Sequence, residues 1–166
     1  MKTLTYAAAY IGTIVAANWA VAAYGPVPVG FGLIAPAGVL FAGLAFTLRD
    51  LLHEAAGVAW AVAAIVAGTA VSVAVAGPGL ALAAGAAFLL SELADLAVYT
   101  PLRRRRWLLA VGLSNAVGLV VDSALFLWLA FGSLAFLPGQ IVGKAYMTVA
   151  ALIVLAPVRA RRTAVA

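Results

Sequence analysis

The sequence contains no cysteine, one histidine and only five acidic residues among 166 positions. Without cysteine the chain has neither disulfides nor thiol chemistry. A single histidine also falls far short of the four ligands that a structural zinc site uses, so we expect no metal. Charged residues make up 9% of the chain, whereas a soluble domain has about a quarter. The sequence therefore predicts that the solvent around this chain is lipid.

The motifs of several enzyme classes are absent as well. The chain has no H-E-x-x-H, G-x-S-x-G or P-loop pattern, and its one histidine has no evident nucleophilic serine partner. The net charge of +5 raises nucleic acid as a partner, but the basic residues lie at the ends of apolar runs rather than in a stripe with interleaved aromatics. We expect neither an enzyme nor a nucleic-acid-binding protein, and no cofactor.

Hydrophobic residues form 67% of the chain and fall into six long runs. A helix needs about 20 apolar residues to cross the hydrocarbon of a bilayer, so this length suits six spans joined by short loops. We predict an all-α fold: a polytopic membrane helix bundle of six transmembrane helices, forming a single domain over residues 1–166. The expected helices lie at about 4–24, 33–54, 57–76, 80–100, 107–131 and 139–158.

Proline and glycine mark three uncharged turns between these helices, at Gly25 to Gly32, Gly77 to Gly79 and Leu137 to Gly139. The first turn contains two prolines and three glycines. It is either a plain connector, which we favour, or a re-entrant flap that acts as a gate.

Nearly all of the ten basic residues lie at alternate ends of the predicted spans, and only Lys144 falls inside one. This is the positive-inside pattern of a plasma-membrane protein with both termini in the cytoplasm. The residues that we assign to the cytoplasmic side are Lys2, Arg49, Arg103, Arg104, Arg105, Arg106, Arg159, Arg161 and Arg162.

Polar side chains inside the predicted spans are costly in lipid and usually line a cavity or a relay. Counting along each helix at about 1.5 Å per residue places them in two layers. The outer layer contains Asn18, Asp122, Gln140 and Lys144, and the inner layer contains Asp50, His53, Glu54, Glu92, Asp95 and Asn115. Two structural readings compete with binding: Asp122 and Lys144 form an ion pair that only locks two helices, or the group from Arg49 to Glu54 caps a helix at the headgroups.

Five stretches of the sequence carry a family resemblance. They are the region of Asn18; Pro36-Ala37-Gly38 running into Asp50-x-x-x-Glu54-x-x-Gly57; Ser91-Glu92-Leu93-Ala94-Asp95 with Tyr99; Ser114 through Asp122-Ser123-x-x-Phe126; and Gln140-x-x-x-Lys144 followed by Pro157. In their order and spacing the chain resembles the vitamin-uptake-transporter-like family, the queuosine precursor transporters. It departs from many members at Leu119 and Ala56, where they have Gln and Tyr.

The resemblance implies a membrane protein similar to the substrate-binding subunits of energy-coupling-factor transporters, importing 7-deazaguanines such as preQ0 or preQ1 for tRNA queuosine synthesis. Its partners would be a deazapurine and the lipid bilayer, with a homo-oligomer or an energy-coupling module left open. We expect Glu92, before Asp95, to accept from the amine edge of the base. The candidate binding residues are Asn18, Trp19, Asp50, Glu54, Glu92, Asp95, Tyr99, Asn115, Asp122, Phe126, Gln140 and Lys144.

Two other functional classes remain open at this point. The chain is a substrate-binding subunit for another vitamin or nucleobase that works with a separate ATPase module, or it is an assembly protein whose polar residues only lock its helices.

Overall fold

A computed structural model of the chain describes residues 2–77 and 79–163, with side chains as far as residue 154. The side chains of Pro157, Arg159, Arg161 and Arg162 therefore lie outside the described part. The elements are α1 (Lys2–Tyr24), β1 (Pro26–Gly30), β2 (Leu33–Pro36), α2 (Val39–Ala56), α3 (Val58–Val75), α4 (Ala81–Leu102), α5 (Trp107–Phe131) and α6 (Leu137–Thr163).

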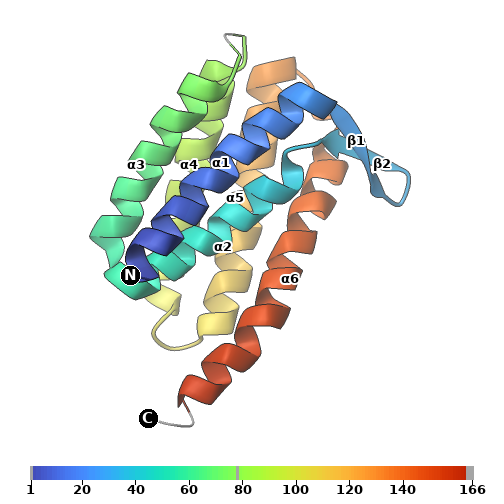
Figure 1. The fold of residues 1–166 in the computed structure, drawn as a ribbon. Helices are drawn as coiled ribbons and strands as arrows, with labels where there is room; N and C mark the ends of the chain where they lie inside the picture. The colour runs from blue at the N-terminus through green and yellow to red at the C-terminus, as the bar shows by residue number, and fades with distance from the viewer. Residues whose placement is uncertain (1, 78, 164–166) are drawn as a thin grey trace.

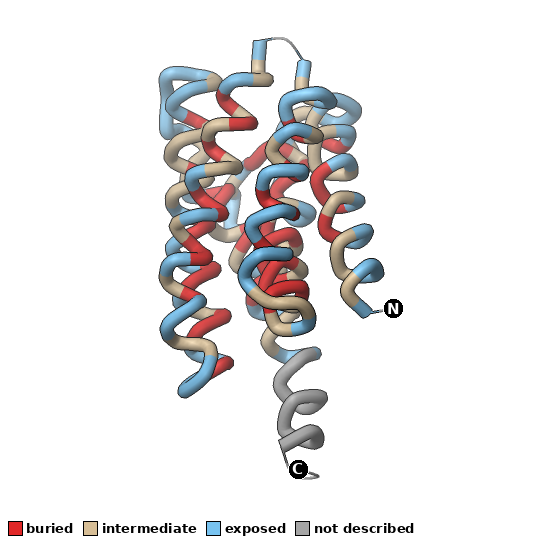
Figure 2. Tube along the Cα trace, turned by 90° about the vertical axis from the view of Figure 1, so that its left-hand side faces the viewer, coloured by how far each residue is buried: buried red, intermediate tan, exposed pale blue. Residues whose placement is uncertain are grey.

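The helices form a bundle, with the small hairpin of β1 and β2 beside the beginning of α6 (Figure 1). The beginning of α1, the loop between α4 and α5 and the end of α6 lie toward the opposite end of the bundle (Figure 1). Buried residues lie on the sides of the helices that face the interior of the bundle, and exposed residues lie on the outer sides (Figure 2). Many of the exposed side chains are large and apolar, among them Leu82, Val66 and Ile153. This outward apolar surface fits a hydrocarbon environment.

Five of the described helices, namely α1, α3, α4, α5 and α6, are long and apolar enough to cross a membrane. The prediction of a multi-pass helix bundle therefore holds. The remaining helix, α2, contains Arg49, Asp50 and Glu54 within 18 residues, so composition alone does not mark it as a span. A count of six spans stays a prediction.

The first turn contains a β-hairpin, which the sequence analysis did not predict. β1 pairs with β2 in antiparallel register, with Pro26 opposite Pro36 and Val27 opposite Ala35. The expected helix start at residue 33 is wrong, and α2 begins at Val39 instead. Prolines on both strands disfavour helix, and a turn with positive φ at Phe31 (53°) and Gly32 (71°) reverses the chain.

The hairpin is fastened to α6 by two contacts. The Tyr146 hydroxyl donates a hydrogen bond to the Val29 carbonyl at 3.0 Å. On the preceding turns of α6, Gly139 lies so close to the Ile34 carbonyl that a Cβ would collide with it. These contacts hold the hairpin against the first half of α6 and place β2, which leads into α2, beside it.

Small residues also bring the helices together around the polar interior. A Cβ on Gly43 of α2 would lie 2.8 Å from the Lys144 carbonyl oxygen of α6. A Cβ on Gly118 of α5 would lie 3.0 Å from the Asp95 Cβ of α4. Glycine thus allows the close packing of α2 on α6 and of α5 on α4 that brings their polar side chains within reach of one another.

Candidate functional site

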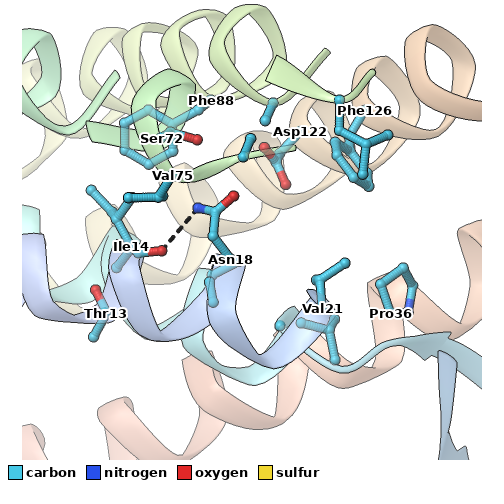
Figure 3. Close-up of a pocket in the computed structure, with 18 of the residues that line it drawn as sticks. Thr13, Ile14, Asn18, Val21, Pro36, Ser72, Val75, Phe88, Asp122 and Phe126 are labelled. Carbon is cyan, nitrogen blue, oxygen red and sulfur yellow. Dashed lines mark hydrogen bonds between the residues drawn. The ribbon is translucent and has the colours of Figure 1, made fainter. Parts of the chain in front are cut away.

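A cavity of about 260 Å³ lies in the half of the bundle that faces away from the loop between α4 and α5. Most of its lining is apolar, and Phe88 of α4 and Phe126 of α5 contribute aromatic rings. Asn18 and Asp122 extend toward it from α1 and α5 (Figure 3). The polar side chains in its lining are Thr13, Asn18, Ser72, Asp122, Gln140 and Lys144.

The ammonium group of Lys144 is fully occupied by protein acceptors. Its Nζ donates to Asp122 Oδ2 at 2.5 Å, to Ser123 Oγ at 2.7 Å and to Gln140 Oε1 at 2.8 Å. An ammonium has three N–H donors, so these contacts use all of them. The predicted pairing of Asp122 with Lys144 is therefore present, and it links α5 to α6.

Asp122 lines the cavity and has one oxygen that does not contact Lys144. The side chain of Lys144 is 1% exposed and that of Asp122 is 16% exposed. The remaining oxygen, Oδ1, lies 3.5 Å from Ser91 Oγ, whose hydroxyl also contacts the Phe88 carbonyl at the shorter distance of 3.0 Å. Asp122 Oδ1 thus has capacity to accept a further hydrogen bond.

Two amides border the same cavity with complementary polar atoms. Asn18 donates through Nδ2 to the Ile14 carbonyl at 2.9 Å, and its carboxamide oxygen points away from that contact (Figure 3). Gln140 accepts from Lys144 through Oε1, which leaves its amide N–H groups as the donors that a ligand can meet. The cavity thus offers an acceptor from α1, an acceptor from α5 and a donor from α6.

A second polar cluster lies apart from the cavity lining. We call Arg49, Asp50, Glu92 and Asp95 the Arg49 cluster. The guanidinium contacts Asp50 Oδ1 at 2.7 Å through Nη1, Glu92 Oε2 at 3.1 Å through Nε, and Asp95 Oδ1 through Nη2. Each of the four side chains is at most 1% exposed. The Tyr10 hydroxyl donates to the other oxygen of Glu92 at 3.1 Å, so α1, α2 and α4 meet here.

Between this cluster and the α4–α5 loop lies a third set of polar contacts. Glu54 accepts from the Tyr99 hydroxyl at 3.1 Å and from Arg103 at 3.0 Å. The Trp107 indole donates to the Tyr99 oxygen at 3.1 Å. On the α6 side, the Asn115 amide lies 3.1 Å from Thr47 Oγ1 and 3.3 Å from Thr148 Oγ1. These residues join helices and do not line the cavity.

The structure divides the predicted binding residues among these groups. Asn18, Asp122, Phe126, Gln140 and Lys144 line the cavity. Trp19 is 58% exposed, and its ring meets that of Tyr24 edge-on. The other six, which take part in the inner hydrogen bonds and ion pairs, are Asp50, Glu54, Glu92, Asp95, Tyr99 and Asn115.

Arg49 is not an exposed basic residue at the end of a span, as the sequence interpretation expected. Its side chain is fully buried and is held by carboxylates of α2 and α4. The alternative reading of this stretch as a cap at the headgroups is also wrong for Arg49, Asp50 and His53, which are all buried. Among the polar side chains of the stretch, only Glu54 is partly exposed, and it pairs with Arg103.

Sequence reasoning missed Phe88 in the cavity lining and Tyr10 as the partner of Glu92. Phe88 lies three and seven residues before Ser91 and Asp95, on the same side of α4, and this helical spacing is the signal that could have found it. Tyr10 carries no comparable signal, because its partner is 82 positions away.

Residues 72–160, more than half of the chain, match the family described as "Putative vitamin uptake transporter". The chain belongs to this family. The matched stretch covers α4 and α5 with most of α6, and so includes the pair of Asp122 and Lys144 as well as Glu92 and Asp95. No curated protein and no solved structure matches the chain. Membership in a transporter family and the apolar helices together indicate a multi-pass membrane protein with a small-molecule substrate.

Proposed function

We propose that this vitamin-uptake family member imports a 7-deazaguanine of the preQ0 or preQ1 type, a queuosine precursor, through the cavity beside Asp122. The observation that carries the proposal is the set of groups around that cavity. Asp122 is the only carboxylate in the lining formed by the described residues, and it lies among two amides and two phenylalanine rings.

The chemistry of a guanine-like base fits these groups. Its amine edge presents an N–H and an exocyclic amine, both of which Asp122 Oδ1 can accept. Its carbonyl oxygen can accept from the amide of Gln140, and its flat faces suit stacking on Phe88 or Phe126. Ligand pockets commonly measure about 300–1,000 Å³, so a cavity of about 260 Å³ suits a small bicyclic ligand.

Asp122 takes the role that the sequence assigned first to Glu92. Both oxygens of Glu92 already have protein partners, Tyr10 on one and Arg49 on the other. Breaking these contacts to bind a base would leave a buried guanidinium with less compensation, which is expensive. Asp122 needs no such exchange, because its Oδ1 is only weakly engaged.

A binding titration of the detergent-purified protein tests this assignment. The probes are preQ1 and the matching deazapurine that lacks the exocyclic amine. Because Asp122→Asn alone would strand Lys144, the variant of choice is the double change Asp122→Asn with Lys144→Met. Loss of a charged acceptor costs about 1.5–3 kcal/mol, so preQ1 should bind roughly ten- to a hundredfold more weakly.

The control is Glu54→Gln, an acidic residue outside the cavity that should leave the affinity for preQ1 unchanged. The amine-free analogue should bind the wild-type protein weakly and lose little more in the double variant. An equal loss for both probes would show that Asp122 supports the fold rather than reading the base. No binding of preQ1 to the wild-type protein would refute the ligand class.

The proposal includes transport by this chain alone. Uptake of preQ1 into liposomes that contain only the purified protein is the expected result. Uptake that appears only after an ATPase module is added would instead make the chain a substrate-binding subunit.

The proposed orientation places both termini and the loop of Arg103 to Arg106 in the cytoplasm, because basic loops stay on that side. A single cysteine at Ser133, in the loop before α6, should then react with an impermeant reagent in intact cells. Labelling only after permeabilisation would reverse the orientation.

A further inference from the structure

The Arg49 cluster contains more negative than positive charge. All five acidic residues of the chain lie in the polar interior described above. Asp122 pairs with Lys144, and Glu54 pairs with Arg103. The three remaining carboxylates share the single guanidinium of Arg49, the one cation that contacts them in the described part of the chain. If all three were ionised, the cluster would carry two uncompensated negative charges.

Such a surplus is not sustainable at this burial. Each member of the cluster is at most 1% exposed. An uncompensated charge in a protein interior or a bilayer costs several kcal/mol, and a carboxylate in that position takes up a proton instead. Among the described residues, no group of three or more acidic or histidine side chains is arranged to hold a metal ion. A proton is therefore the positive species that the geometry favours.

Polar atoms without a hydrogen-bond partner in and beside the cluster also support proton binding. Asp50 Oδ2 and both ring nitrogens of His53 are buried and have no hydrogen-bond partner among the described residues. His53 lies one turn beyond Arg49 on α2, with its ring 5.4 Å from that of Tyr99. The guanidinium carbon of Arg49 lies 5.8 Å from the same Tyr99 ring. Groups able to bind a proton thus adjoin the cluster without a hydrogen-bond partner among the described residues.

We propose that the Arg49 cluster is a proton-binding site, which holds two protons among Asp50, Glu92 and Asp95 at rest and exchanges protons with water during transport. The first part stands on the charge balance alone. The second part rests on the proposed transport function, and makes it a proton-coupled one.

Polar side chains also lie on both sides of the cluster. Toward the cavity, Glu92 directly follows Ser91, whose hydroxyl lies 3.5 Å from Asp122 Oδ1. Toward the α4–α5 loop, His53 and Tyr99 lead to the pair of Glu54 and Arg103, which is 25% and 20% exposed. Chains of carboxylates and histidine of this kind serve as proton relays in membrane carriers.

The ionisable groups around the cluster come from few elements. Helix α1 contributes Tyr10, and the start of the α4–α5 loop contributes Arg103. Helix α5 faces this region with the uncharged Ser114 and Asn115, and Lys144, the charged residue of α6 whose side chain is described, pairs with Asp122. The remaining groups are Arg49, Asp50, His53 and Glu54 on α2, and Glu92, Asp95 and Tyr99 on α4.

Infrared difference spectroscopy of the detergent-purified protein tests the proton site without any transported ligand. A carbonyl band of protonated carboxyl should be present at neutral pH, shift in heavy water and disappear in the double variant Glu92→Gln with Asp95→Asn. This variant removes two acidic groups and leaves Asp50 paired with Arg49, so it should fold with an unfolding temperature no lower than the wild-type value. The control Glu54→Gln, which alters a carboxylate with its own cation, should keep the band.

Absence of the band from the wild-type protein would overturn the proposal, because all carboxylates would then be ionised. A band that changes with sodium concentration at fixed pH would equally overturn it, in favour of a metal cation. Unfolding of the double variant while the wild-type protein shows no band would mark the cluster as a purely structural ion network.

Liposomes that contain the purified protein test the coupling. With preQ1 on both sides, the wild-type protein should exchange labelled preQ1, and an inward proton gradient should drive its accumulation. The double variant should still exchange preQ1 but lose the accumulation. Exchange by the wild-type protein without any response to the gradient would overturn the coupling and leave the proposed ligand intact. No exchange at all would refute the proposed transport and the coupling with it, while the infrared band would still decide the proton site.

Discussion

The two ionic groups in this bundle differ in how their charges are matched. In the cavity one ammonium meets one carboxylate, and its other two donors are satisfied by Ser123 and Gln140. In the Arg49 cluster one guanidinium meets three carboxylates, and every side chain is buried. A buried ion pair of equal and opposite charges is electrically neutral by itself. A buried cluster with a surplus of negative charge requires a further positive species to neutralise it. Under our two proposals, the first group recognises a ligand and the second exchanges protons.

The largest expected effect is that of Arg49→Met, because it removes the only cation from the cluster. Breaking a buried ion pair costs about 3–5 kcal/mol, and here the two protonated carboxyl groups lose their contact with the guanidinium as well. We expect little folded protein after detergent extraction, measured by size-exclusion chromatography and thermal unfolding. Arg104→Met, in the exposed part of the loop, is the control and should unfold like the wild-type protein. A stable Arg49→Met variant would show that the carboxylates are all neutral, and would remove the contrast between the two groups.

A smaller effect is expected at the matched pair. Asp122→Asn and Lys144→Met should each lower the free energy of unfolding by about 2.5–3.5 kcal/mol, because each leaves one charge alone in the membrane interior. The double change removes both charges and should cost less than either single change. Unfolding of all four proteins in detergent completes a double-mutant cycle, in which the coupling should exceed the larger single effect and so be more than about 2.5 kcal/mol. Additive effects would mean that the two charges do not stabilise each other.

The smallest effect is expected for Tyr10→Phe, and it tests whether Glu92 is protonated. Tyr10→Phe removes the one hydrogen bond that Glu92 receives from α1. A hydrogen bond to a neutral group contributes about 0.5–1.5 kcal/mol and one to a charged group about 1.5–3 kcal/mol. If Glu92 is protonated, the loss in unfolding free energy should fall in the lower range. Tyr24→Phe, at an exposed ring, should have no measurable effect, and a loss in the upper range for Tyr10→Phe would place the protons on Asp50 and Asp95.

Hydropathy and helical spacing predicted the parts of the molecule that depend on local sequence. The bounds of α1, α3, α4 and α5 follow from long apolar runs ended by glycine, proline or arginine. The pairing of Asp122 with Lys144 followed from counting depth along two adjacent helices, because their distance from the membrane faces is fixed by rise per residue. The division into a cavity layer and an inner layer followed from the same count.

The features that escaped prediction depend on tertiary packing. Arg49 lies near the end of its helix, where a basic residue usually marks the cytoplasmic face, yet the close approach of α4 buries it against Glu92 and Asp95. Residues 33–36 have an apolar composition that reads as helix, but their pairing with the proline-containing β1 makes them a strand. Which carboxylate faces the cavity likewise depends on how α4 and α5 are rotated about their axes, and spacing within one helix cannot fix that.

The helices of this bundle differ in length, and a bilayer adjusts its thickness to helices that are longer or shorter than its hydrocarbon layer. Helices α2 and α3, which are joined through Gly57, have 18 residues each and are about 27 Å long. Helix α5 has 25 residues and is about 37 Å long. The hydrocarbon layer of a bilayer is about 30 Å thick, which exceeds the length of α2 and α3 and is less than the length of α5. With α2, α3 and α5 in a bilayer, we expect lipid to thin beside α2 and α3 and the bundle to tilt toward them, which shortens the projected length of α5. Helix α2 carries Arg49 and Asp50, so we expect the charged interior to lie where the membrane is thinnest.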